Sequence, residues 1–299
     1  MHLPYFLRCC ICIAALVLPL LPVSVRAEPP ALAAGVRVLR DLPYVSDGHA
    51  RQRLDLYLPA KAENAPLLIW IHGGGWEGGS KENCPAVGLV GQGYTVASLN
   101  YRLSQHAPFP AQIEDCKAAV RWLRAHAAEY GYNPACIGAW GASAGGHLVA
   151  MLGVTGEMKE FDVGENLEQS SAVKCVINWF GPADFLRFKE LVGKERDRPG
   201  SLLARFFGGP FSEKTELARR ASPVTWVTKT AAPMLILHGT KDALVPLSQS
   251  EVLAERLTAA GVEVTLEVLE GAPHGGPEFS TAEKRKLMND FLKRHLQPS

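Results

Sequence analysis

A serine with the spacing G-x-S-x-G stands in the pentapeptide Gly141-Ala142-Ser143-Ala144-Gly145. Apolar strand-like residues precede it and apolar helix-like residues follow, which predicts a sharp strand-to-helix turn that exposes the serine hydroxyl as a nucleophile. Gly141 and Gly145 are small enough to let the strand and the helix pass closely. The helix would aim backbone N–H groups and its positive dipole end at the reacting centre. Ala144 N–H is therefore a candidate donor to a developing oxyanion.

A glycine-rich segment at 72–76 reads HGGGW and follows the apolar run 67–71. Consecutive glycines let backbone N–H groups approach a ligand without a Cβ in the way. Alone, such a segment also fits a flexible turn. Beside the serine turn it predicts a second oxyanion loop, with the N–H groups of Gly74 and Gly75 as candidate donors.

A serine hydroxyl needs a positioned base, and that base needs an acid to hold its tautomer. Asp242 follows the strand-like run 234–237, and His274 follows the run 262–269. The order Ser, Asp, His is the one expected of a hydrolase with this serine turn. Asp184 also follows an apolar run and competes for the role of acid, but a loop after the penultimate strand places Asp242 beside His274.

The remaining histidines fit structural or solvated positions better than the role of base. His238 ends an apolar run, which favours a buried histidine that supports the site. His147 falls one helical turn after Ser143, where packing or hydrogen bonding within the site is the simpler reading. Four others lie in polar or helical surroundings and are expected to be solvated: His49, His106, His126 and His295.

The elements that must position these groups alternate along the chain. Strand-like runs lie near 52–58, 67–72, 94–99, 136–140, 174–180, 233–238 and 262–269, and helix-length segments near 81–92, 110–129, 144–153, 247–260 and 281–296. This order predicts an α/β fold, with a mostly parallel central sheet and helices on both faces. With 299 residues and 47% hydrophobic residues, one domain can bury a full core. The functional loops all follow strand ends, where parallel sheets place their sites.

The chain resembles the α/β-hydrolase superfamily, in particular the secreted esterase group that includes hormone-sensitive-lipase-like enzymes and the acetyl xylan and feruloyl esterases. The resemblance spans about 40–297. Its matching segments are LDLYLP at 54–59, HGGGW at 72–76, NYRLS at 100–104, FPAQ at 109–112 with Asp115, the serine turn, WFGP at 179–182 and the loops of Asp242 and His274. It implies an α/β-hydrolase fold with Ser143 as nucleophile, His274 as general base and Asp242 as its orienting acid. It also implies an oxyanion hole made by Gly74, Gly75 and Ala144.

The expected activity is that of a secreted serine carboxylic ester hydrolase that forms an acyl-enzyme. No large N-terminal cap is present to shelter long acyl chains, so short-chain or aromatic acyl esters, including esters of carbohydrates, fit better. Trp76 and Trp179 are candidates to stack on such a substrate, although both, like Trp140, also fit the core. An amide-cleaving hydrolase of the arylformamidase or peptidase type is the alternative, and a non-catalytic binding protein is a further one. The segment 183–225 is expected to form either a small lid or a plain surface insertion.

Residues 1–27 have the pattern of a signal peptide, with Arg8, an apolar stretch and small residues before a cleavage site after Ala27. The domain would then span 28–299, in a secreted or periplasmic protein without stable membrane insertion. A formal net charge of +1 with no long run of Lys and Arg argues against nucleic acid as a partner. No cofactor is implied, and the oligomeric state stays open.

The cysteines of the expected mature chain are Cys84, Cys116, Cys136 and Cys175. An even number in an exported protein suggests two disulfides. The hypothesis is that Cys84 pairs with Cys116 and Cys136 with Cys175, and the alternative is four free buried thiols. No metal site is expected, because these cysteines contain no C-x-x-C and no closely spaced His pair is present.

Overall fold

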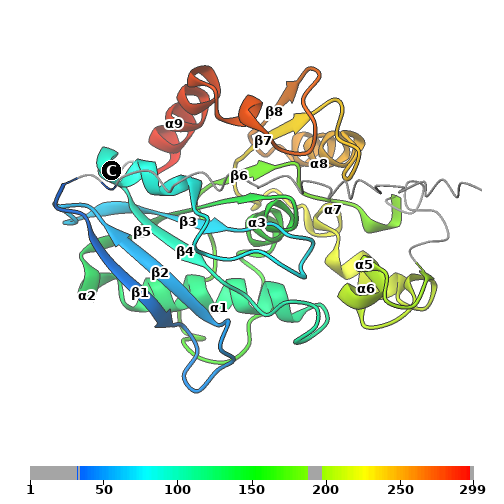
Figure 1. Cartoon of the computed structure of the whole chain (residues 1–299), viewed down its shortest axis with the longest axis horizontal. Helices are drawn as coiled ribbons and strands as arrows, with labels where there is room; N and C mark the ends of the chain where they lie inside the picture. The colour runs from blue at the N-terminus through cyan, green and yellow to red at the C-terminus, as the bar shows by residue number, and fades with distance from the viewer. Residues whose placement is uncertain (1–31, 33, 188–196, 297–299) are drawn as a thin grey trace, which may run out of the picture.

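The computed structural model describes residues 32, 34–187 and 197–296. Within them, an eight-stranded sheet has the order β1-β2-β4-β3-β5-β6-β7-β8 (Figure 1). The strands are β1 (Arg37–Pro43), β2 (Arg53–Leu58), β3 (Ala65–Ile71), β4 (Thr95–Leu99), β5 (Tyr132–Ala142), β6 (Val176–Trp179), β7 (Met234–Gly239) and β8 (Val264–Leu269). The β1–β2 and β2–β4 pairs are antiparallel, and every later pair is parallel. The carboxyl ends of the parallel strands therefore meet at one edge, where loops can form a site.

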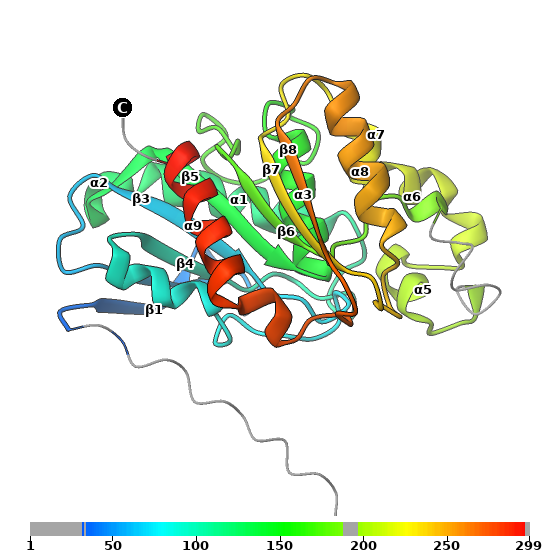
Figure 2. The ribbon, with the colours of Figure 1, turned by 90° about the horizontal axis from the view of Figure 1, so that it is seen from above.

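Helices cover both faces of this sheet. They are α1 (Ala111–Ala125), α2 (Ala127–Tyr130), α3 (Ala144–Thr155), α5 (Leu202–Phe207), α6 (Thr215–Ala221), α7 (Pro223–Trp226), α8 (Ser248–Ala259) and α9 (Ala282–Leu296), with 3-10 helices η1 (Pro85–Gln92), η3 (Phe211–Glu213) and η4 (Pro277–Ser280). Buried side chains of α1, α3 and α8 belong to the core on one face, and those of η1 and α9 to the core on the other. Figure 2 shows α9 lying along one face of the sheet.

The central strand β3 illustrates why the sheet is buried on both sides. Its sequence APLLIWI has no charged residue, as expected for a parallel strand between two helical layers. Leu67, Ile69 and Ile71 face the α1 and α3 core, whereas Leu68 and Trp70 face the η1 and α9 core. The period of two in a strand sends alternate side chains to the two layers.

The predicted alternation of strands and helices is confirmed, with three differences. The structure adds β1, which the sequence hides because this edge strand is charged and largely exposed. Strand β5 begins at Tyr132, earlier than the expected start at 136. The expected helix at 81–92 is the 3-10 helix η1, which begins only at Pro85.

Two predicted segments fall partly or wholly outside the described residues. The expected signal peptide at 1–27 lies outside them, and so do residues 188–196 of the expected lid or insertion at 183–225. The described part of that insertion contains α5, η3, α6 and α7, between β6 and β7. Figure 2 places α5 and α6 beyond the β7 and β8 side of the sheet.

The disulfide hypothesis is wrong, because Cys84, Cys116, Cys136 and Cys175 are all free and buried. Cys84 belongs to the core on the η1 face and Cys116 to the core on the α1 face, so the sheet lies between them. The β5–β6 register, Ala139 opposite Val176, places Cys175 opposite Gly138. Cys136 is then two residues further along β5, which separates the two Cα atoms by roughly 8 Å. A disulfide requires a separation below about 7 Å.

Candidate active site

Ser143 occupies the turn between β5 and α3. Its φ of 55° and ψ of −121° place a residue with a Cβ in a strained conformation that the surrounding turn maintains. The backbones pass so closely that a Cβ on Gly141 would lie 2.3 Å from Gly145 O, and one on Gly145 would lie 2.0 Å from Ile71 O. The two glycines of the pentapeptide are therefore required for strand β5 and helix α3 to cross beside β3.

The structure brings Ser143, His274 and Asp242 together from three separate loops. His274 Nε2 lies 2.9 Å from Ser143 Oγ, so the serine hydroxyl can donate to it. His274 Nδ1 donates to Asp242 Oδ2 at 2.6 Å. The carboxylate fixes the imidazole in the tautomer whose Nε2 is free to accept the serine proton. The Asp242 side chain is fully buried, whereas that of His274 is 17% exposed and can meet a substrate.

Hydrogen bonds keep Asp242 ionised despite its burial. Burial alone would raise the pKa of its carboxyl, but hydrogen bonds from His238, from His274 and from the backbone N–H groups of Val245 and Leu244 hold that pKa well below its usual range. Both backbone groups donate to Oδ1, at 2.8 Å from Val245 and 2.9 Å from Leu244. The carboxylate is therefore a fixed negative charge beside the imidazole at neutral pH.

His238 is buried beside Asp242, in agreement with the expectation of a buried histidine that supports the site. Its Nε2 lies 2.8 Å from Val245 O and 3.3 Å from Asp242 Oδ2. Its Nδ1 lies 2.6 Å from Ser250 Oγ. Because Nε2 faces two acceptors, it carries the proton, and Nδ1 accepts from the hydroxyl of Ser250.

Asp184, the competing acid, contacts residues that directly follow it in the sequence. Its Oδ1 accepts from the N–H groups of Leu186 at 3.0 Å and Arg187 at 3.1 Å. Its Oδ2 lies 3.7 Å from Arg187 Nε. These contacts are typical of a carboxylate that caps a helical turn. The geometry therefore favours Asp242 as the partner of His274.

The glycine loop, defined here as residues 72–76, lies beside the serine turn. A Cβ on Gly73 would lie 3.2 Å from Ser143 Cβ, and Gly74 and Gly75 have φ of +105° and +59°. Among the described residues, no acceptor is found for the backbone N–H groups of Gly74, Gly75 or Ala144. Unpaired donors on both sides of a serine hydroxyl are what an oxyanion hole requires.

A set of hydrogen bonds around the buried His72 holds the glycine loop in place. His72 Nδ1 donates to Gly73 O at 2.7 Å, and its ring stacks on Tyr101 with centroids 4.5 Å apart. Arg51 Nη2 donates to His72 Nε2 at 3.1 Å and to Gly79 O at 3.0 Å, and Arg51 Nε donates to Tyr101 O at 2.9 Å. Burial lowers the pKa of His72 to about 4, so its imidazole is neutral and can accept from the guanidinium.

Arg51 is a site residue that sequence reasoning missed. A single arginine before a strand carries no local signal, because its role depends on three backbone segments that meet only in the folded chain. Tyr101 belongs to NYRLS at 100–104, one of the segments that match the family. That match was the only signal in the sequence for this set of hydrogen bonds.

Trp76 and Trp179, the candidate substrate-binding tryptophans, are both packed in the core. Trp76 is 2% exposed, stacks on Phe206 at 4.2 Å and donates from Nε1 to His147 Nδ1 at 3.2 Å. Trp179 is buried against Trp140, with ring centroids 4.9 Å apart. The packing of both residues favours the core alternative over stacking on a substrate.

His147 serves packing, as the sequence indicated. Its Nε2 donates to Ala221 O at 2.7 Å, which leaves Nδ1 to accept from Trp76. Burial lowers the pKa of His147 to about 4 against the opposing effect of the Ala221 carbonyl. The neutral ring connects α3, the glycine loop and the end of α6, and its two nitrogens are engaged by Trp76 and Ala221.

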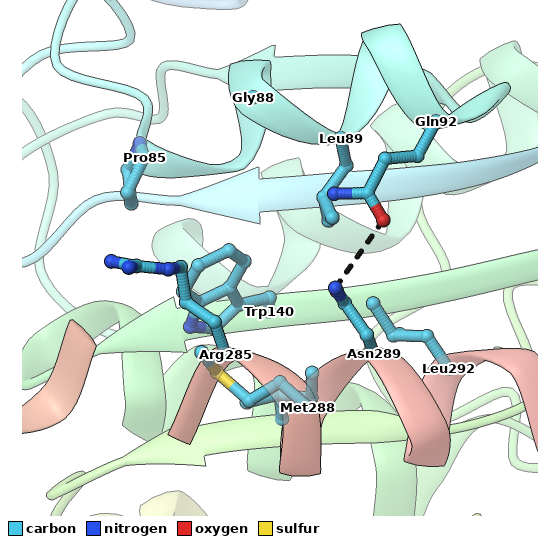
Figure 3. A pocket seen from close by; sticks show the side chains of 10 residues that line it. Pro85, Gly88, Leu89, Gln92, Trp140, Arg285, Met288, Asn289 and Leu292 are labelled. Carbon is cyan, nitrogen blue, oxygen red and sulfur yellow. Dashed lines mark hydrogen bonds between the residues drawn. The ribbon is translucent and has the colours of Figure 1, made fainter. Parts of the chain in front are cut away.

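A cavity of about 160 Å³ lies between η1 and α9 (Figure 3). Leu89, Trp140 and Met288 are among its apolar lining residues, and Asn289 Nδ2 donates to Gln92 Oε1 at 3.3 Å between the two elements. It lies on the face of the sheet that α9 covers. None of the candidate residues of the serine site lines it.

Residues 32, 34–187 and 197–296 contain no cluster of three or more His, Cys, Asp or Glu side chains arranged to hold a metal ion. Over the same ranges, no helix has the length and apolarity needed to cross a bilayer.

Comparison with known proteins places this site in a family. The BD-FAE family model matches residues 54–257, which include the glycine loop, Ser143 and Asp242. This chain belongs to the BD-FAE family. The esterase LipC of Mycobacterium tuberculosis is 32% identical over 233 residues, which cover 75% of this chain and 57% of LipC. The BD-FAE chain thus spans less than two thirds of the length of that relative.

Solved structures confirm the α/β-hydrolase fold of this BD-FAE member and its resemblance to the esterase group. A truncated carbohydrate esterase from gut microbiota is 31% identical with a TM-score of 0.80, over 87% of this chain and 96% of that one. Esterase Est2 of Thermogutta terrifontis with propionate bound is 26% identical with a TM-score of 0.69, over 89% of this chain and 97% of that one. The shared fold extends over nearly all of the described residues.

Proposed function

We propose that this protein is a secreted serine carboxylic ester hydrolase that works through an acyl-enzyme. The observation that carries the proposal is the continuous chain of hydrogen bonds from Ser143 Oγ through His274 to Asp242, with separations of 2.9 and 2.6 Å. The esterase names of its relatives support the same reaction class. Secretion rests on the signal-peptide pattern of residues 1–27, and a mature chain that begins at Glu28 by mass spectrometry would support it.

In the first half-reaction, Ser143 Oγ attacks the carbonyl carbon of the ester. His274 Nε2 takes the serine proton as the Oγ–C bond forms, and the buried carboxylate of Asp242 stabilises the resulting imidazolium. When the tetrahedral intermediate collapses, the bond to the leaving oxygen breaks. The imidazolium returns its proton to that oxygen, which leaves as an alcohol, and the acyl group stays on Ser143.

In the second half-reaction, water replaces the alcohol. His274 Nε2 accepts a proton from the water as its oxygen attacks the acyl carbon. The Oγ–C bond then breaks, Ser143 recovers its proton from His274 and the carboxylic acid leaves. No cofactor enters either half-reaction.

The negative charge of each tetrahedral intermediate needs donors that are already oriented. The N–H groups of Gly74, Gly75 and Ala144 are proposed to supply them, because they flank Ser143 and have no acceptor among the described residues. Ala144 also begins α3, so the helix dipole adds favourable potential at the same point. One such donor typically contributes about 10²–10³-fold to kcat.

The proposed substrates are short-chain or aromatic acyl esters, including esters of carbohydrates. Among the structures with this fold, an esterase with bound propionate supports an acid of small size, and a carbohydrate esterase supports esters of carbohydrates. Trp76 and Trp179 are no longer the preferred contacts for a sugar or an aromatic ring, because both are packed in the core.

Hydrolysis of 4-nitrophenyl acetate by the purified mature protein tests the proposal, beside the Ser143→Ala variant. We expect turnover that the variant loses while its melting temperature stays close to that of the wild type. An active Ser143→Ala variant would remove Ser143 as the nucleophile. Inactivity on esters together with cleavage of an anilide or formamide by the wild type would favour the amide-hydrolase alternative.

A further inference from the structure

An exposed leucine of α5 lies directly over the glycine loop. A Cβ built on Gly75 would lie 2.9 Å from Leu202 Cδ1, so the isopropyl group of Leu202 covers that side of Gly75. Leu202 nevertheless keeps 40% of its surface exposed. An apolar surface is therefore available to a ligand immediately beside a proposed oxyanion donor.

The helix that carries Leu202 is fastened to the same loop region. Arg205 of α5 donates from Nη2 to Glu77 Oε2 at 2.6 Å, and its Nε pairs with the other carboxylate oxygen. The Phe206 ring stacks on Trp76 with an interplanar angle of 23°, and Phe206 O accepts from Phe109 N at 2.8 Å. A bidentate ion pair and a buried aromatic stack hold α5 in register with the loop.

The proposed reaction fixes where the substrate must lie relative to Leu202. A carbonyl oxygen bound by Gly75 N–H sits about 3 Å from that nitrogen, which places the carbonyl carbon roughly 4 Å from it. The leaving oxygen must face His274 Nε2, which protonates it. The acyl substituent is then the group left to extend along the glycine loop.

We propose that Leu202 forms a wall of the acyl-binding site and restricts the enzyme to short acyl groups such as acetyl. The inference rests on the proposed function, which it narrows from short-chain or aromatic acyl esters to the short-chain ones. A longer chain would have to displace Leu202, and the anchoring of α5 through Arg205 and Phe206 opposes that movement.

The test compares kcat/KM for 4-nitrophenyl acetate, butyrate and octanoate in three variants. Leu202→Ala opens the wall and should raise the butyrate to acetate ratio about ten-fold, whereas Leu202→Phe should lower it. The matched control is Leu167→Ala. Leu167 is a leucine of similar exposure at 47%. It follows the C-terminal end of α3, whereas Ser143 precedes the N-terminal end. That control should keep the wild-type ratio. An unchanged ratio in both Leu202 variants would overturn the inference.

A second readout separates this inference from the proposed function. Ethyl 4-nitrophenyl phosphonates carrying a methyl, propyl or hexyl group are attacked by a serine nucleophile, which forms an O–P bond and releases 4-nitrophenolate. Mass spectrometry then shows whether the label is on Ser143. Labelling of Ser143 whose rate falls with alkyl length in the wild type, and falls less in Leu202→Ala, is the expected result. A labelling rate that does not change with alkyl length overturns this inference alone. Absence of any label on Ser143 overturns both proposals.

Discussion

Replacement of Asp242 by Asn should move the proton of the His274 ring from Nδ1 to Nε2. Asp242 Oδ1 accepts two backbone N–H groups, from Leu244 at 2.9 Å and Val245 at 2.8 Å, while Oδ2 faces His274 Nδ1 at 2.6 Å. In the Asp242→Asn variant the same backbone donors would hold the amide oxygen. The amide NH₂ must then face His274 Nδ1. Because an NH₂ group can only donate, His274 would carry its proton on Nε2 and could not accept one from Ser143.

The magnitude follows from this loss of the correct tautomer. We expect kcat for 4-nitrophenyl acetate to fall by about 10⁴-fold, equivalent to about 5.5 kcal/mol of transition-state stabilisation. KM should change little, because Asp242 is buried behind the imidazole and does not reach the substrate. Stopped assays with enzyme at high concentration measure the residual rate, and a thermal melt establishes that the variant is folded.

Asp184→Asn is the matched control for this prediction. Its carboxylate contacts only Arg187 and the backbone N–H groups of residues 186 and 187 among the described residues, so turnover should stay near the wild-type rate. A folded Asp242→Asn variant that keeps more than about a tenth of the wild-type rate would refute the tautomer argument. A large loss in Asp184→Asn with activity retained in Asp242→Asn would transfer the role of acid to Asp184.

Four further outcomes test the structure. Gly145→Ala places a Cβ 2.0 Å from Ile71 O and should destabilise the fold by ~4 kcal/mol or more, seen as a collapse of the melting temperature or of soluble yield. An unaltered melt would contradict the close crossing. Arg51→Met removes the donors to His72 and Gly79 and should lower kcat by up to about 100-fold through a displaced glycine loop, with a smaller loss of thermal stability. Full activity in that variant would show that the loop holds without this set of hydrogen bonds. The pKa of Asp242 is depressed in the folded state, so its contribution to stability is complete above the unfolded pKa of about 4 and is lost as the pH falls below it. The difference in melting temperature between the wild type and Asp242→Asn should therefore shrink on acidification, and a constant difference would contradict the depressed pKa. Alkylation of the denatured mature chain without reductant should label four thiols, Cys84, Cys116, Cys136 and Cys175, whereas none labelled would restore the two disulfides.

Each loop expected to form the site has a local physical reason that can be seen in the sequence. Residues 141–145 need small side chains at both ends of the serine turn, and the distances at Gly141 and Gly145 show how little room the crossing leaves. The apolar runs before Asp242 and His274 placed both at strand ends, where a parallel sheet brings its loops together. The edge strand β1 escaped prediction because an exposed strand has no apolar run to mark it.

The cysteine pairing, the burial of Trp76 and the role of Arg51 could not be predicted, because they depend on the face of the sheet that a residue occupies and on its neighbours there. Cys84 and Cys116 are separated by the sheet, a fact that no spacing along the chain reveals. Trp76 follows the glycines of a loop, and only the packing of Phe206 against it shows that the ring is buried. Arg51 acquires its role from backbone groups of three segments that are distant in sequence.

By itself, the sequence determined the alternation of the strands and helices that carry the site, the strained serine turn and the presence of a hydroxyl, an imidazole and carboxylates at strand ends. Turn geometry and periodicity are local properties, so residue types and spacing are enough to specify them. Tertiary structure decided that Asp242 and not Asp184 faces His274, that the cysteines stay apart and that Leu202 stands over Gly75. Those relations depend on the register of the strands and on the packing of α5, which no segment of the chain contains on its own.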